Sequence, residues 1–112
     1  MKIIDTKITI AELIAMQDNF FGDMVKGVVD VRLGVLAVDA ELHADLESLL
    51  LSEGSRQQDL WGINLFPEME GEDMVEFDSM INIRPWQNNY GRGVDSEETR
   101  DAIIDVIKRV VK

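Results

Sequence analysis

Cysteine is absent from this chain, and histidine occurs once, as His43. The absence of cysteine excludes disulfide bonds, cysteine nucleophiles, cysteine-ligated zinc and iron–sulfur clusters. A single histidine also excludes a zinc or iron site with two histidine ligands from one chain. A serine triad would have to use His43 as its base, and the sequence contains no Gly-x-Ser-x-Gly motif. The common catalytic constellations are therefore largely missing.

Basic residues are scarce as well. The 112 residues include 22 Asp and Glu against 11 Lys and Arg, which gives a net charge of −11. Proteins that bind nucleic acids or anionic membranes usually carry a basic patch, so we expect neither kind of partner. No apolar run is long enough to span a bilayer, and the N-terminus lacks the apolar segment of a signal peptide. These features predict a cytoplasmic protein.

The composition is that of a folded protein. Apolar residues make up 46% of the chain, and only two prolines interrupt it. No internal repeat, low-complexity tract or linker is present. This length and composition predict a single domain over residues 1–112 with its own hydrophobic core.

Three helices are predicted from capping signals. The segment Thr9–Glu12 has the residues of a capping box at the start of the first helix. Asp45 is placed as the N-cap of a short helix over residues 46–53. The third helix begins at Asp95 or Ser96 and ends in basic residues that complement its dipole.

Four strands are predicted, at residues 24–31, 35–42, 59–66 and 74–84. A three-residue loop that ends in Gly34 joins the first two strands into a hairpin. The connection between the second and third strands is long enough for a crossover, so that pair is allowed to run parallel. The predicted order is α-β-β-α-β-β-α. We therefore expect an α+β, two-layer sandwich, in which helices cover one face of a four-stranded, mostly antiparallel sheet.

The uncovered face of that sheet would carry a candidate catalytic or metal site. Alternation along the 35–42 strand places Asp39, Glu41 and His43 on this face, about 6.6 Å apart per step. Carboxylates and an imidazole suit Mn, Fe or Zn, and they also form acid–base pairs. Asp78 on the 74–84 strand is a candidate fourth ligand. The alternative is a solvated polar face or a dimer interface, which is common in antiparallel sheets.

The segment 85–94 is a candidate recognition loop. Trp86, Asn88 and Tyr90 combine aromatic area with hydrogen-bonding capacity. Arg84 and Arg92 are placed to hold a carboxylate or phosphate between them. The alternative is an ordinary connection in which Trp86 packs onto the core and Arg92 pairs with an acid.

Two neighbouring residues in the 59–66 strand have structural interpretations. Trp61 is expected in the core. Gly62 marks either a bulge or a close approach of another part of the backbone.

Three segments carry a family resemblance. They are Glu41-Leu42-His43-Ala44-Asp45, Asp59-Leu60-Trp61-Gly62-Ile63-Asn64 and Glu76-Phe77-Asp78-Ser79-Met80-Ile81-Asn82-Ile83-Arg84-Pro85. Over nearly its full length the chain resembles a family of small bacterial and archaeal proteins known only as a domain of unknown function. The resemblance implies a single cytosolic domain. It implies no activity, substrate or cofactor and transfers no functional residue.

Taken together, these observations predict a non-enzymatic interaction module. We expect it to form a homo-oligomer or to bind a protein partner, and we expect no cofactor. The alternative is a metal-dependent hydrolase or lyase that acts on a small polar or anionic substrate through Asp39, Glu41 and His43. A third interpretation is a small-molecule or nucleotide binder that uses the loop over residues 86–92.

Overall fold

The strand β4 (Leu60–Leu65) is buried along its whole length, so both faces of the sheet around it must be covered. The computed structural model describes residues 1–112 and places β4 in a five-stranded sheet with the order β1-β3-β2-β4-β5. Every neighbouring pair of strands is antiparallel. The other strands are β1 (Lys2–Ile4), β2 (Val25–Asp30), β3 (Val35–Val38) and β5 (Val75–Glu76).

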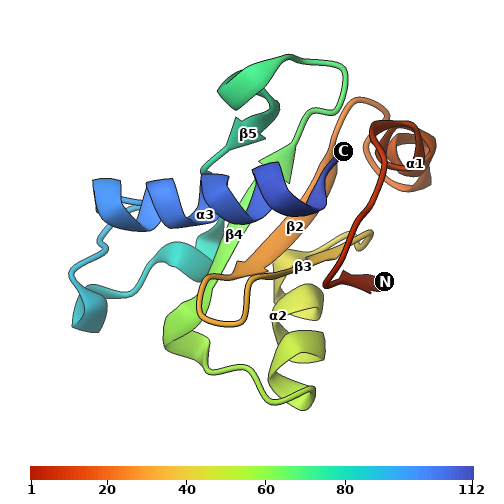
Figure 1. The fold of residues 1–112 in the computed structure, drawn as a ribbon. Helices are drawn as coiled ribbons and strands as arrows, with labels where there is room; N and C mark the ends of the chain where they lie inside the picture. Colours follow the sequence, from red (N-terminus) through yellow and green to blue (C-terminus); the bar gives the residue numbers. More distant parts are fainter.

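Helices cover both faces of this sheet (Figure 1). On one face, α3 (Glu97–Val110) and α1 (Ile10–Met16) contribute to a core of 18 buried residues that includes Val29. On the opposite face, α2 (His43–Ser52) packs in a second core of six buried residues that includes Val28. Consecutive residues of β2 therefore lie in different cores, as the alternation of side chains along a strand requires.

The α+β class is confirmed, but the two-layer arrangement is wrong. The molecule has three layers, because Leu46 and Leu50 of α2 pack against Val28, Ala37 and Leu60 on the face that was predicted to be polar. Part of that face remains open beyond α2, and the candidate site described below lies there.

The predicted strand count and order also need correction. The three-residue strand β1 was not predicted, and it pairs with β3. The strand expected over 74–84 shortens to β5, after which the chain forms 3₁₀-helical turns at Met80–Asn82 and Pro85–Gln87. The crossover that was allowed between the second and third predicted strands is present: β3 and β4 are both antiparallel to β2, which lies between them, so they run parallel to each other and are connected through α2. The observed order of helices and strands is β-α-β-β-α-β-β-α.

An asparagine side chain takes the place of strand pairing where the chain leaves the sheet. The Gly62 N–H donates to Asn82 Oδ1 at 2.8 Å, and Asn82 Nδ2 donates to the Gly62 carbonyl at 3.0 Å. Ser79 lies directly over Gly62, and a Cβ atom at Gly62 would be 2.5 Å from the Ser79 side chain. A close approach at Gly62 is therefore present, but the approaching atoms belong to the side chains of Ser79 and Ile81 and not to backbone, as had been predicted.

The local capping signals are also confirmed. Thr9 and Glu12 form both hydrogen bonds of the capping box at α1. Ser96 accepts from the Thr99 N–H at the start of α3. Gly34 has a φ of +71° in the loop between β2 and β3. In contrast, α2 begins at His43, earlier than predicted, and has no side-chain cap.

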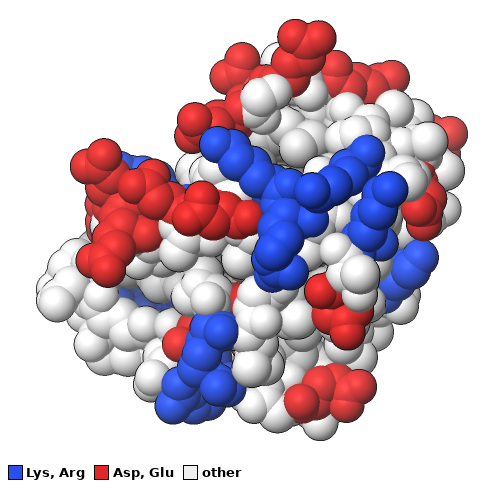
Figure 2. All heavy atoms as spheres, viewed as in Figure 1, with Lys and Arg blue, Asp and Glu red and all other residues white.

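The charged residues of α3 are segregated along the helix. Its first turn carries acidic residues and its last turn carries Lys108 and Arg109. Figure 2 shows the two groups over opposite ends of the helix on one face of the molecule. This arrangement complements the helix dipole, as the sequence predicts. None of the helices is both long and apolar enough to cross a bilayer.

We predict that Gly62→Ala destabilises the fold by about 1–3 kcal/mol, because the new methyl group overlaps Ser79 and forces the adjoining segment to move. Urea unfolding followed by circular dichroism measures the change. Gly27→Ala is the matched control in a neighbouring strand, where the new Cβ would lie 3.1 Å from the flexible end of Leu36. Equal losses for the two variants would contradict the close approach.

Candidate functional site

The predicted set of Asp39, Glu41, His43 and Asp78 is not brought together. The strand β3 ends at Val38, and Asp39 turns away with a φ of +75° and accepts a hydrogen bond from Asn19 at 2.8 Å. Glu41 is exposed in the following loop. No group of three or more acidic or histidine side chains is close enough to hold a metal ion. The alternation that predicted the site was wrong, because residues 39–43 are not in a strand.

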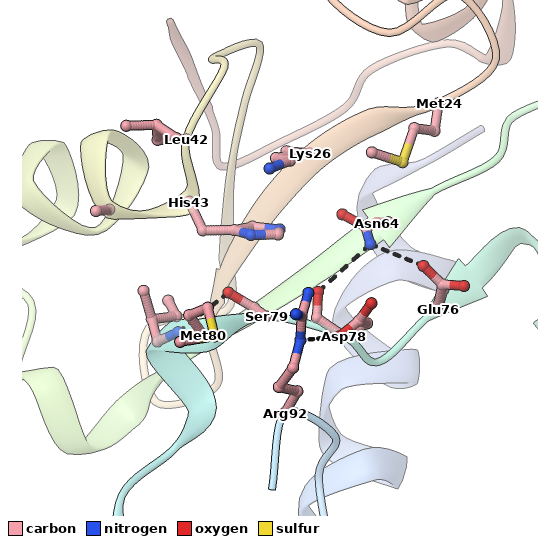
Figure 3. Close-up of a pocket in the computed structure, with 12 residues that line it drawn as sticks. Met24, Lys26, Leu42, His43, Asn64, Glu76, Asp78, Ser79, Met80 and Arg92 are labelled. Atoms are coloured by element: carbon pink, nitrogen blue, oxygen red, sulfur yellow. Dashed lines mark hydrogen bonds and ion pairs between the residues drawn. The ribbon is translucent and has the colours of Figure 1, made fainter.

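His43 and Asp78 do share a different site. They line a cleft of about 370 Å³ on the sheet face that carries α2, at the start of that helix. Figure 3 shows side chains from α2, from three strands and from the segment after β5 pointing toward this space. The residues that line the cleft are Met24, Lys26, Leu42, His43, Ala44, Asn64, Glu76, Asp78, Ser79, Met80, Ile81 and Arg92.

A row of three polar side chains crosses the floor of the cleft. Lys26 on β2 is the direct partner of Asn64 on β4, and Asn64 is the direct partner of Glu76 on β5. Adjacent strands lie about 4.8 Å apart, so the ammonium and carboxylate groups stand on either side of the amide. The register of β2, β4 and β5 brings these three residues together, although they are distant in the sequence.

The amide of Asn64 is only half satisfied. Its Nδ2 donates to Glu76 Oε1 at 2.8 Å and to the Asp78 carbonyl at 3.4 Å. These two acceptors determine which end of the amide is nitrogen. The Oδ1 atom is buried and has no hydrogen-bond partner. An unpaired buried acceptor costs about 1–3 kcal/mol, so a ligand that donates a hydrogen bond to Asn64 Oδ1 would bind favourably.

His43 is held in one orientation beside this row. Its Nε2 lies 2.8 Å from the Ile63 carbonyl, which can only accept, so Nε2 carries the proton. Burial lowers the pKa of His43, and the positive charge of Lys26 lowers it further, against the opposing effects of the Ile63 carbonyl, Asp78 and the Asn64 side chain. The imidazole is therefore neutral at neutral pH.

Arg92 closes one wall of the cleft. Its Nε donates to Asp78 Oδ1 at 2.6 Å, and both side chains are about half exposed. The alternative interpretation of Arg92, as a residue paired with an acid, is therefore correct in the structure. The backbone of Arg92 is anchored as well, because its carbonyl accepts from the Ser79 N–H and from Asn82 Nδ2.

Arg84 does not take part in any surface site. It is 1% exposed, and its guanidinium stacks on Trp61 at 4.1 Å from the ring centroid. It also donates to the carbonyls of Leu60, at 2.7 Å, and Gln57. The predicted anion clamp of Arg84 and Arg92 is wrong, because the guanidinium of Arg84 is buried and already bonded within the protein. Trp61 is buried, as expected.

The loop over residues 85–94, called the aromatic loop below, is built around Asn89. Asn89 Nδ2 donates to the carbonyls of Asn82 at 2.7 Å and Gly93 at 2.8 Å, and its Oδ1 accepts from the Asp95 N–H at 2.8 Å. The backbones of Arg84 and Asn89 also bond to each other. Sequence reasoning did not single out Asn89, although asparagine in a turn often bonds to nearby backbone.

The outer residues of the aromatic loop are exposed. Trp86 is 71% exposed and Tyr90 is 67% exposed. Asn88 is also exposed and adopts the left-handed conformation, with a φ of +59°. The alternative in which Trp86 packs onto the core is wrong. Trp86, Asn88 and Tyr90 remain candidate contact residues.

Comparison with known proteins places the chain in a family. A family model described as a protein of unknown function (DUF5674) matches residues 2–110. The chain belongs to this family. No curated protein and no solved structure matches it. The resemblance to a domain of unknown function is thus confirmed, and the three segments that carry it each contribute residues to the cleft.

We predict that Arg84→Met lowers the free energy of unfolding by about 2–4 kcal/mol, because the buried carbonyl of Leu60 and the partly buried carbonyl of Gln57 lose their donor and Trp61 loses the cation on its face. The matched substitution Arg92→Met, at a half-exposed ion pair, costs at most about 1 kcal/mol. Urea unfolding of both variants tests the contrast. A loss for Arg92→Met as large as that for Arg84→Met would contradict the assignment.

We predict that the pKa of His43 in the folded protein lies below the ordinary histidine value of 6.5, because burial disfavours the charged imidazole. As the only histidine, it gives an unambiguous Hε1 signal in NMR spectra. As the pH falls, His43 binds a proton in the unfolded chain before it does so in the folded protein. Its contribution to the free energy of unfolding is therefore present above pH 6.5 and is lost as the pH falls below that value. Protein unfolded in urea is the control, and an equal midpoint in the folded protein would contradict the prediction.

Proposed function

We propose that this protein is a non-enzymatic binding module that holds a protein partner through the aromatic loop. The observation that carries the proposal is the exposure of Trp86 and Tyr90 on a loop that the side chain of Asn89 holds from inside through three hydrogen bonds. We place this activity in the cytoplasm, the compartment that the sequence predicts. No contact in the structure favours the alternative of a metal-dependent hydrolase or lyase.

The loop is preorganised for binding. Asn89 and Arg84 hold it from inside, so the loop backbone needs little further ordering when a partner arrives. Binding then avoids much of the entropy cost that a flexible loop would incur. Exposed tryptophan and tyrosine are also the residues that most often dominate the binding energy of protein interfaces.

The surroundings of the loop favour a basic partner. A hollow of about 550 Å³ beside it is lined mainly by amides and hydroxyls, and Asp95 is its only charged residue. Glu97 and Glu98 follow in the first turn of α3. Figure 2 shows Asp and Glu side chains gathered over this end of the helix. Two copies of a chain with a charge of −11 repel each other, so the occupant is a different protein with a basic segment.

The test is site-specific photo-crosslinking in the source cells. A photoreactive phenylalanine replaces Trp86, and a matched control protein carries it at Phe20, which is 50% exposed outside the aromatic loop. We expect a discrete heteromeric adduct from position 86 only. The crosslinked protein is then purified, and its affinity is measured with Trp86→Ala and Tyr90→Ala, each of which should weaken binding about 30-fold, or about 2 kcal/mol.

Two outcomes would contradict the proposal. Equal crosslinking from Phe20 and Trp86 would show that the loop is not a preferred contact. Sedimentation equilibrium that shows a dimer lost on Trp86→Ala would replace the heteromeric partner with a second copy of this chain.

A further inference from the structure

We propose that the cleft beside α2 binds a small zwitterion of the α-amino-acid class with an apolar side chain. This cleft shares Arg92 with the aromatic loop but none of its exposed contact residues Trp86, Asn88 and Tyr90, and its occupancy does not depend on a protein partner. The proposal rests on the row of Lys26, Asn64 and Glu76, on the unpaired Asn64 oxygen and on the apolar rim of the cleft.

The charges around the cleft balance. Lys26 and Arg92 contribute two positive charges, Glu76 and Asp78 contribute two negative charges, and His43 is neutral. A simple cation would meet two cationic side chains, and a phosphate would meet two carboxylates. A ligand that carries one positive and one negative group can pair with the carboxylates and with the cationic side chains at the same time. This balance stands out in a chain whose net charge is −11.

Lys26 is the free cation of the cleft. No carboxylate lies within ion-pair distance of it, and its ammonium rests 4.9 Å from the ring centroid of Phe21. Arg92, in contrast, is already paired with Asp78. A ligand carboxylate would therefore lie toward β2, where Lys26 supplies an uncompensated positive charge.

Asn64 and Glu76 define the opposite end of the ligand. No hydrogen bond within the protein reaches the buried Oδ1 of Asn64, so this oxygen is free to accept from an N–H or O–H group of a ligand. Glu76 stands next to it in the row and favours a positively charged donor. An ammonium group meets both requirements, and it would lie on the β4–β5 side of the bound carboxylate.

The remaining wall is apolar. Met24, Leu42 and Met80 line the cleft around the polar row, and Leu42 and Met80 are 53% and 65% exposed. Methionine side chains adapt to ligands of different shape. The cleft volume of about 370 Å³ is at the small end of the range for ligand sites. These features favour an amino acid with an aliphatic or thioether side chain.

The test is NMR titration of the whole protein with three related compounds. L-leucine carries both charges, leucinamide lacks the carboxylate and N-acetyl-leucine lacks the ammonium. The reporters are the side-chain amide of Asn64 and the Hε1 proton of His43. We expect saturable shifts with L-leucine at millimolar concentration and affinities about tenfold weaker for each of the other two, since each loses one charge-assisted contact.

Charge-neutralising variants assign each end of the ligand. Lys26→Gln should weaken L-leucine binding about tenfold and leave leucinamide binding unchanged. Glu76→Gln keeps an acceptor for Asn64 but should weaken L-leucine and spare N-acetyl-leucine. Lys7→Gln and Glu68→Gln are matched controls at exposed residues without side-chain partners, and they should bind L-leucine normally. Circular dichroism and unfolding midpoints verify that each variant is folded.

Three results would overturn the proposal. The first is the absence of shifts at Asn64 and His43 with L-leucine and with L-methionine at millimolar concentration. The second is binding of N-acetyl-leucine or leucinamide as tight as that of L-leucine. The third is a loss of binding in Lys7→Gln equal to that in Lys26→Gln. None of these results bears on crosslinking at Trp86, so the two proposals fail independently.

Discussion

The pairing of the Asn82 side chain with the backbone of Gly62 is the interaction on which the C-terminal half of the fold depends. It gives the edge of β4 a hydrogen-bonded neighbour after β5 has ended, and so it lets the chain leave the sheet without unpaired backbone groups. Ser79 must then lie against Gly62, which only a residue without a Cβ atom allows. This departure places Asp78 and Ser79 at the cleft.

The same junction connects the two proposed surfaces. Asn82 also bonds to the carbonyl of Arg92, whose side chain closes the cleft, and its own carbonyl accepts from Asn89 inside the aromatic loop. Arg84 follows and fills the space under Trp61. Buried side chains that bond to the backbone on both sides, as Asn82 and Asn89 do, hold a loop in one conformation. The backbone conformation of the aromatic loop and the shape of the cleft therefore have one physical origin.

The errors in the sequence interpretation have a common cause. The alternation over 74–84 predicts a strand, yet Asn82 and Arg84 alternate with apolar residues because they satisfy backbone groups of β4 and its flanks, not because they face water. Likewise, alternation beyond Val38 placed His43 on a strand, although it begins α2. Periodicity reports which residues are buried, and it does not distinguish a strand from a polar side chain that substitutes for one.

The features that can be predicted correctly from the sequence are local. The capping residues of α1 and α3, the turn at Gly34, the central hairpin and the α+β class follow from contacts within a few residues, so they can be read in order along the chain. Three other features follow from long-range packing: helices cover both faces, β1 joins the sheet, and Lys26 and Glu76 flank Asn64. These features depend on which strands become neighbours and in what register, and that choice is made by the packing of the whole chain.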